Sequence, residues 1–260
     1  MKWLTRGCVA LVLALSGCAG DSDDGTDSGQ SPTATVSEDP TASLLERCSS
    51  MIPSGAPVRQ LTLGEQSLAV FEATNPGKTV MVLLHQTGPS GLCGWGRFAT
   101  QAAKQGVSSV ALDMCGYGAS TCPSDEDPTV QVKAAVDYAR HQLRARRVVL
   151  VGASMGGSST VIAAAGGARV DGWVDVSGPA AWGDVELQDL AGRLSKPGMV
   201  VYARSDGPAE YSSAKRLAAS CGARFVDGGA GHGYELMADY TGKLLPGGRA
   251  VLAFVEGLKA

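Results

Sequence analysis

The sequence predicts an α/β domain built on a mostly parallel, doubly wound sheet of about eight strands, and two observations support this fold class. From residue 79 onward, short continuous apolar runs rich in β-branched residues alternate with longer segments of helical periodicity. Strands that are apolar on both faces are typical of a parallel sheet with helices on both sides. In addition, the apolar run 148–151 breaks into the pentapeptide GASMG at residues 152–156, where a strand turns sharply into a helix.

The elements can be assigned in chain order. Residues 58–63 and 67–72 alternate in polarity around a Gly-Glu-Gln turn, which predicts an antiparallel hairpin at the sheet edge. The segment between residues 176 and 199 is too short for a helical cap domain, so we expect no sizeable cap and an open site. The other expected elements are strand 79–84, helix 95–105, strand 108–112, helix 129–144, strand 148–151, helix 154–165, strand 170–176, strand 199–203, helix 209–220, strand 224–226 and a C-terminal helix ending near residue 259.

The N-terminal 17 residues have the pattern of an export signal. Lys2 and Arg6 precede the apolar run 9–15, which is too short to span a bilayer as a stable helix. The run ends in the tetrapeptide LSGC, which resembles a bacterial lipobox. That resemblance implies that Cys18 receives diacylglycerol and holds the mature protein at the extracytoplasmic face of the cell membrane. A soluble secreted protein is the alternative.

Residues 21–41 are expected to form an unfolded tether. They consist almost entirely of Asp, Ser, Thr, Gly and Pro, with six acids and no bases, and cannot bury enough apolar surface to fold. We therefore divide the chain into a lipoprotein signal peptide at 1–17, an acidic tether at 18–43 and one folded domain at 44–260. The formal net charge is −3, and the tether acids account for all of this excess, so a nucleic-acid partner is not expected. We expect a monomer.

The pentapeptide at residues 152–156 is typical of a nucleophile elbow. Such a turn lifts a serine hydroxyl above the C-terminal edge of a sheet, and it requires small residues two positions before and after the serine. Gly152 and Gly156 satisfy this requirement around Ser154. An ordinary Gly-rich crossover turn is the alternative.

Across residues 58–260, the order of elements and the elbow motif resemble the α/β-hydrolase family. The resemblance implies a Ser–acid–His triad in that chain order, with each residue on a loop at the C-terminal edge of the sheet. The imidazole of His232, in the Gly-rich loop 227–233, matches the family's catalytic histidine. His141 lies in a basic amphipathic helix, and His85 ends a strand where the family usually has a His-Gly pair.

The acid of the triad is expected after strand 199–203. Asp206 has that place, where it would accept a hydrogen bond from His232 and fix the tautomer of the imidazole. Asp175, at the end of the preceding strand, and Asp227 are the alternatives.

Two backbone N–H groups are expected to bind the oxyanion. The resemblance assigns one to Met155, at the N-terminus of the helix after the elbow, and the other to Thr87 or Gln86. Gln86 replaces the glycine of the family's His-Gly pair, so its side chain could itself contact substrate.

Residues 113–120 resemble the family's Gly-rich loop after the next strand. Tyr117 on this loop, together with Trp95 and Trp182, could line the acyl pocket or belong to the core. Export permits disulfides, and one is expected among Cys93, Cys115 and Cys122, while Cys48 and Cys221 could pair.

The sequence therefore predicts a lipid-anchored serine hydrolase, most simply a carboxylic ester hydrolase that uses an acyl-enzyme. A peptidase or amidase with the same triad, and a non-catalytic binding lipoprotein, remain as alternatives. Haloalkane and epoxide chemistry are disfavoured because those relatives have an aspartate as the nucleophile. We find no phosphate-binding loop, zinc-ligand spacing or calcium loop, so no metal or cofactor is expected, and the expected partner is a small ester or a peptide-like substrate.

Overall fold

The structure, a computed structural model, describes residues 39–74, 76–194 and 197–258. The chain divides into two units, Met1–Ser37 and Glu38–Ala260, and every described residue lies in the second. The predicted signal peptide, the lipidation site at Cys18 and nearly all of the predicted tether therefore lie outside the described residues. Among the helices that the structure describes, none is both long enough and apolar enough to cross a membrane.

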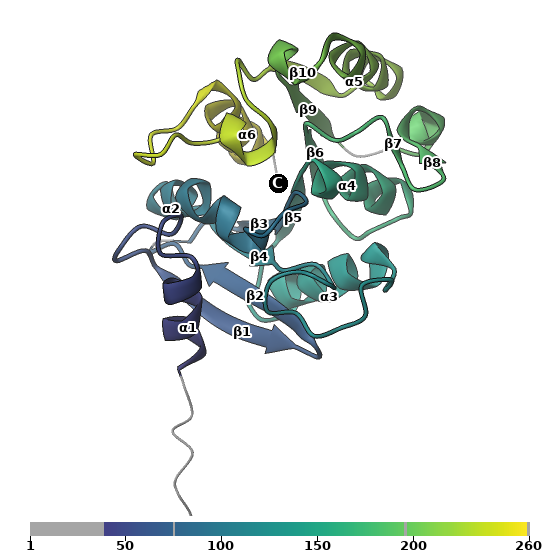
Figure 1. The fold of residues 1–260 in the computed structure, drawn as a ribbon. Coiled ribbons are helices and arrows are strands. Elements are labelled where there is room, and N and C mark those ends of the chain that lie inside the picture. The colour runs from purple at the N-terminus through teal and green to yellow at the C-terminus, as the bar shows by residue number, and fades with distance from the viewer. Residues whose placement is uncertain (1–38, 75, 195–196, 259–260) are drawn as a thin grey trace, which may run out of the picture. The chain divides into compact units, whose positions relative to one another are not determined.

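One eight-stranded sheet forms the centre of the second unit (Figure 1). Its strands are β1 (Val58–Leu63), β2 (Gln66–Phe71), β3 (Thr79–Leu84), β4 (Ser108–Leu112), β5 (Arg147–Ala153), β6 (Gly172–Val176), β9 (Gly198–Tyr202) and β10 (Arg224–Asp227). They lie in the order β1-β2-β4-β3-β5-β6-β9-β10, with β1 and β2 antiparallel to their neighbours and the others parallel. The predicted fold class is confirmed, and the predicted hairpin lies at the sheet edge.

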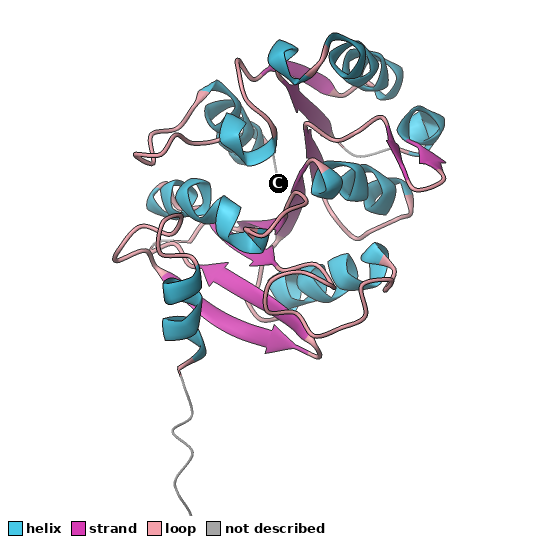
Figure 2. Cartoon of the chain, viewed as in Figure 1, coloured by secondary structure: helices cyan, strands magenta, loops and turns pink. Residues whose placement is uncertain are grey.

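Helices cover both faces of this sheet (Figures 1 and 2). In the described part of the chain they are α1 (Pro40–Arg47), α2 (Gly96–Lys104), α3 (Pro128–His141), α4 (Met155–Ala165), α5 (Pro208–Cys221) and α6 (Pro246–Gly257). Helices α1, α2 and α6 lie on one face, and α3, α4 and α5 on the other. Helix α1 was not expected: it begins at Pro40, so the folded part starts before residue 44.

Side chains of the central strands alternate between two cores. In β5, Val149 and Val151 pack toward α1, α2 and α6, whereas Val148 and Leu150 pack toward α3. All four side chains are fully buried. A strand with apolar residues on both faces is stable only in this covered position, which is why the sequence shows continuous apolar runs.

The described residues between β6 and β9 contain only the short hairpin of β7 (Ala181–Trp182) and β8 (Val185–Glu186) and the 3-10 helix η2 (Leu187–Arg193). This agrees with the expectation that no sizeable cap covers the site.

Candidate active site

Ser154 lies in a strained backbone conformation between β5 and α4. Its φ is 50° and its ψ is −116°, a combination that L residues rarely adopt outside functional turns. The Ser154 N–H donates to the carbonyl oxygen of Val176 at the end of β6, 2.8 Å away, which fixes the turn against the neighbouring strand. This is the strand–turn–helix geometry that the elbow motif predicts.

The two glycines of the elbow have no room for a side chain. A Cβ built on Gly152 would lie 1.8 Å from the carbonyl oxygen of Gly156, and a Cβ on Gly156 would lie 2.3 Å from the carbonyl oxygen of Leu84. Because Leu84 ends β3, the N-terminus of α4 is packed directly on the start of the loop that contains Gln86 and Thr87. The backbone N–H of Met155 therefore belongs to a helix end that lies beside this loop.

Asp206 and His232 are brought together from two different loops. Asp206 ends the 3-10 helix η3 (Arg204–Asp206) after β9, and His232 precedes the 3-10 helix η4 (Gly233–Leu236) after β10. His232 Nδ1 lies 2.7 Å from Asp206 Oδ1. With Nδ1–H as the donor, Nε2 of the imidazole is left as a base.

The loop of His232 also contacts the residue before Ser154. A Cβ built on Gly233 would lie 3.4 Å from the Cβ of Ala153, so the histidine loop packs against the end of β5. The backbone N–H of His232 donates to Glu235 Oε2 at 3.3 Å, and the N–H of Gly231 donates to Ser205 Oγ at 3.1 Å. These contacts hold the imidazole at the edge of the sheet where Ser154 lies.

The two alternative acids have other partners. Asp227 Oδ2 accepts a 3.0 Å hydrogen bond from the hydroxyl of Tyr211. The pKa of Asp227 is held below its usual range, mainly by a hydrogen bond from the backbone N–H of Gly229. Asp175 accepts a 2.8 Å hydrogen bond from the N–H of Gly178, and its complete burial raises its pKa to about 7. Asp206 is the one of the three that contacts His232.

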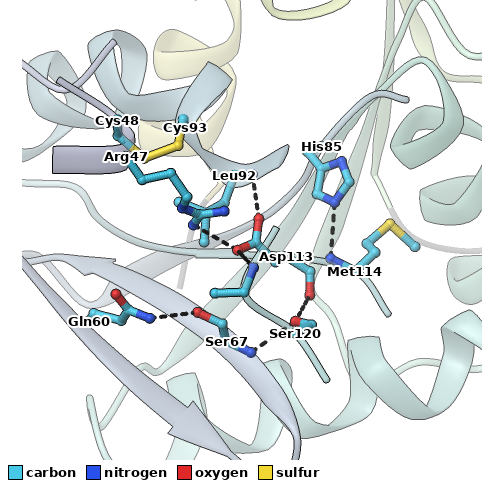
Figure 3. Close-up of polar contacts among 11 residues, drawn as sticks. Arg47, Cys48, Gln60, Ser67, His85, Leu92, Cys93, Asp113, Met114 and Ser120 are labelled. Atoms are coloured by element: carbon cyan, nitrogen blue, oxygen red, sulfur yellow. Dashed lines mark hydrogen bonds and ion pairs between the residues drawn. A yellow bond between two sulfur atoms is a disulfide. The ribbon is translucent and has the colours of Figure 1, made fainter. Parts of the chain in front are cut away.

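His85 is a buried structural residue that links two loops. Its Nδ1 lies 2.7 Å from the carbonyl oxygen of Gln86, and its Nε2 accepts a 3.0 Å hydrogen bond from the N–H of Met114 (Figure 3). Burial lowers its pKa, which keeps the imidazole neutral and able to accept from Met114. Thr87, two residues farther along, is exposed.

Asp113, the residue directly after β4, joins three segments of the chain, as Figure 3 shows. Its fully buried carboxylate accepts hydrogen bonds from Arg47 Nη2 at 2.7 Å, from the N–H of Leu92 at 2.9 Å and from the N–H of Ala119 at 3.0 Å. These donors come from α1, from the 3-10 helix η1 (Gly91–Trp95) and from the loop after β4. Sequence analysis had assigned no role to Arg47.

The three predicted pocket aromatics have different positions. Trp95 is fully buried and packs against Tyr234 and Phe98, so it belongs to the core rather than to a substrate-contacting surface. Tyr117 is partly buried, with its ring edge-on to His85 at a centroid distance of 4.9 Å. Trp182 is partly buried in the β7–β8 hairpin.

Two disulfides join four of the cysteines. Cys115 pairs with Cys122, as one of the expected possibilities, and Cys48 pairs with Cys93. The suggested pairing of Cys48 with Cys221 is wrong, because η1 brings Cys93 against the end of α1, and Cys221 is a free thiol on α5. In the described part of the chain, the one cluster of potential metal ligands is Cys115, Cys122 and Glu126, and its two sulfurs are joined to each other.

Comparison with known proteins agrees with this geometry. The family model described as alpha/beta hydrolase fold matches residues 80–184, which include the elbow. The TT1662 protein from Thermus thermophilus matches with a TM-score of 0.62 and 18% identity, over 79% of this chain and 99% of that chain. The chain has the α/β-hydrolase fold.

Other α/β-hydrolase-fold structures are similarly distant in sequence. Proline iminopeptidase from Mycobacterium smegmatis matches with a TM-score of 0.60 and 12% identity, over 76% of this chain and 97% of that chain. Est1E from Butyrivibrio proteoclasticus matches with a TM-score of 0.55 and 15% identity, over 77% and 96%. No curated protein sequence matches significantly. At such identities the likeness concerns the fold and not the reaction.

Proposed function

We propose that the protein is a serine hydrolase that cleaves carboxylic esters through an acyl-enzyme, with Ser154 as nucleophile, His232 as base and Asp206 as its orienting acid. The observation that carries the proposal is the 2.7 Å contact between Asp206 and His232, on a loop that packs against the residue preceding Ser154. A strained serine, an imidazole and a carboxylate at one sheet edge are the components of nucleophilic acyl transfer.

In the first half of the reaction, the Ser154 hydroxyl attacks the ester carbonyl while His232 Nε2 accepts the hydroxyl proton. The negative charge of Asp206 stabilises the imidazolium that forms. The N–H of Met155, at the positive end of α4, and the N–H of Thr87 or Gln86 stabilise the oxyanion. Collapse of this intermediate expels the alcohol, which takes the proton from His232, and leaves an acyl group on Ser154.

In the second half, water repeats the attack on the acyl-enzyme. His232 accepts a proton from that water, hydroxide adds to the acyl carbonyl, and the carboxylic acid leaves as Ser154 recovers its proton. This scheme needs neither metal nor cofactor, because the developing charges are met by the imidazole and by backbone dipoles.

The decisive test is labelling with a fluorophosphonate, which reacts with an activated serine. We expect the wild-type protein to be labelled at Ser154, and Ser154→Ala to lose both the label and ester hydrolysis while remaining folded. Ser212→Ala, which removes an exposed hydroxyl on α5, is the matched control and should behave as wild type. Absence of labelling in the folded wild-type protein would favour the non-catalytic binding lipoprotein.

A substrate screen separates ester from amide hydrolysis. Among the similar structures, Est1E is recorded with ferulic acid bound and another is an iminopeptidase, so both kinds of substrate belong in the screen. p-Nitrophenyl esters of increasing chain length should be hydrolysed, and aminoacyl anilides should react more slowly because an amine is the poorer leaving group. Faster turnover of the anilides would make the protein a peptidase.

We also propose that Cys18 carries the lipid anchor and that the acidic segment after it acts as a spacer outside the cytoplasm. The proposal rests on the short apolar run followed by LSGC in the sequence. Mass spectrometry of the mature N-terminus tests it: an acylated Cys18 is expected, and an unacylated chain that starts elsewhere would indicate plain secretion.

A further inference from the structure

The side chain of Gln86 connects the loop that contains Gln86 and Thr87, the proposed oxyanion loop, to the loop of His232. Gln86 Oε1 accepts a hydrogen bond from the backbone N–H of Tyr234 at 3.3 Å, although the two residues are 148 positions apart in the sequence. A Cβ built on Gly233 would lie only 1.9 Å from the same oxygen. The amide of Gln86 therefore rests on the backbone immediately after His232, and a glycine at position 86 could make no such contact.

Gly233 lies close to two elements of the proposed site. A Cβ added to Gly233 would lie 1.9 Å from the Gln86 amide oxygen and 3.4 Å from the Cβ of Ala153, which precedes Ser154. Gly233 is buried and has a φ of 57°, a left-handed conformation that bends the chain between His232 and Tyr234. The Gln86 side chain is therefore in close contact with the residue that directly follows His232.

The backbone of Gln86 is itself held firmly. Its carbonyl oxygen lies 2.7 Å from His85 Nδ1, and His85 Nε2 accepts from the N–H of Met114. This places Gln86 at the end of a chain of contacts that begins in the loop after β4, and Figure 3 shows the contact of that chain between His85 and Met114. The backbone of Gln86 is therefore held in place, and its side chain connects this fixed backbone to the loop of His232.

Tyr234 is fixed on its other side as well. Its ring lies directly against Gly94, where an added Cβ would be 2.1 Å from Cε1, and it is edge-on to Trp95 at a centroid distance of 6.2 Å. The ring of His232 itself contacts Asp206 through Nδ1. The backbone after His232 is thus anchored by Gln86 while the ring is oriented by Asp206.

We infer that Gln86 is a positioning residue, whose side-chain oxygen holds the peptide after His232 so that Nε2 of the imidazole is directed at Ser154. The inference rests on the proposed function, and it assigns the side chain of Gln86 an action through His232 instead of through the substrate. Small misplacements of a catalytic group reduce turnover strongly, by about 10²-fold for a displacement of about 1 Å. The inferred role therefore predicts an effect on kcat.

Two substitutions separate the hydrogen bond from the bulk of the side chain. Gln86→Met keeps the length of the side chain but has no oxygen, whereas Gln86→Glu keeps an acceptor at the same place. For Gln86→Met we expect kcat to fall by about 10-fold to 100-fold, with KM within about twofold of wild type for short and long esters. For Gln86→Glu we expect most of kcat to return. A KM that rises in a substrate-dependent way would show a substrate contact and overturn the inference, as would a wild-type kcat in Gln86→Met.

Hydrogen exchange of the Tyr234 amide tests the contact whether or not the protein hydrolyses esters. Exchange should be faster in Gln86→Met and close to wild type in Gln86→Glu, with equal melting temperatures confirming that both variants are folded. Faster exchange with undiminished turnover would make the contact purely structural and overturn the inference. Unchanged exchange in Gln86→Met would also overturn it, because the hydrogen bond would then not hold this peptide.

If the wild-type protein lacks Ser154-dependent hydrolysis, the proposed function fails, and a positioning role in catalysis fails with it. The exchange result would still report on the contact between Gln86 and Tyr234 alone.

Discussion

The carboxylate of Asp206 contacts Nδ1 of His232 through Oδ1 at 2.7 Å, while its second oxygen, Oδ2, is buried and has no hydrogen-bond partner among the residues that the structure describes. The side chain of Asp206 is 12% exposed and that of His232 is 41% exposed, so the pair has a sheltered acid and an imidazole that substrate can reach. This asymmetry suits an orienting acid behind a base.

Asp206→Asn should reduce kcat/KM for ester hydrolysis by about 10³-fold or more, because a neutral amide neither stabilises the imidazolium nor enforces the tautomer with a proton on Nδ1. Asp227→Asn, at the end of β10, is the matched control, and we expect it to remain within about threefold of wild type, since Asp227 contacts Tyr211 and Arg204. Steady-state kinetics with a p-nitrophenyl ester measures both. The reverse ranking would transfer the role of acid to Asp227.

The features that could be predicted from the sequence are local ones. The elbow around Ser154 depends on glycines two residues away, and Asp206 and His232 each follow a strand within a few residues. Short-range pattern and the order of elements were therefore enough to propose these residues, and the structure brings Asp206 and His232 into contact. Helix α1 also had a local signal that we did not use: Asp39 caps its N-terminus and Pro40 occupies its first turn.

The features that the sequence did not predict depend on contacts between distant segments. Arg47 contacts Asp113 at a sequence separation of 66, and Gln86 contacts Tyr234 at a separation of 148. Neither separation belongs to a sequence motif that would predict the contact. The pairing of Cys48 with Cys93 depends in the same way on how α1 packs beside η1. The burial of Trp95 could not be distinguished from a pocket position because an aromatic side chain is common in both places.

Gly156→Ala should destabilise the protein and reduce its activity. The new methyl group would meet the carbonyl oxygens of Leu84 and His85 at 2.3 and 2.8 Å, and backbone atoms of a central strand cannot easily move away. Overpacking of this kind costs about 1 to 3 kcal/mol, and it would push the N-terminus of α4 away from the oxyanion loop. Gly192→Ala is the control in urea unfolding, because a Cβ added there would have no described atom within 4 Å apart from those of the neighbouring residues in the chain. Equal stability of the two variants would contradict the close contact at the elbow.

Loss of the Cys48–Cys93 disulfide should destabilise the protein more than loss of Cys115–Cys122. The first closes a loop with a sequence separation of 45 and the second one of 7, and the entropy removed from the unfolded chain grows with loop length. We expect Cys48→Ala/Cys93→Ala to lose about 2 to 4 kcal/mol, and Cys115→Ala/Cys122→Ala to lose about 1 to 2 kcal/mol less than that. Urea unfolding measures both, with Cys221→Ala as the control that breaks no bridge. An equal loss for the two pairs would show that the entropy of the unfolded chain is not the main source of the stability that these disulfides contribute.

Asp175 introduces a pH dependence that does not involve the proposed triad. Its carboxyl group is fully buried between Gly157 and Gly178, where added Cβ atoms would lie 2.3 and 2.4 Å from Oδ1, and burial raises its pKa from 3.8 to about 7. Below about pH 4 the group is protonated in both the folded and the unfolded protein. Between about pH 4 and pH 7 the unfolded chain releases this proton and the folded protein retains it, so the free energy of unfolding falls as the pH rises.

Asp175→Asn should remove this contribution, because the amide oxygen can still accept from the N–H of Gly178 and the side chain has no charge to bury. The free energy of unfolding of the variant minus that of wild type should therefore increase from about pH 4 to about pH 7, by about 1.4 kcal/mol per pH unit at most, and become constant above about pH 8. Urea unfolding at intervals from pH 4 to pH 9 measures this difference, in which the titration of other groups, including His85, cancels. Asp125→Asn, at an exposed position, should give a difference that does not depend on pH in this way. A pH-independent difference for Asp175→Asn would mean that the carboxyl group is ionised in the folded protein throughout, with its charge satisfied by the Gly178 amide and the N-terminal turn of α4.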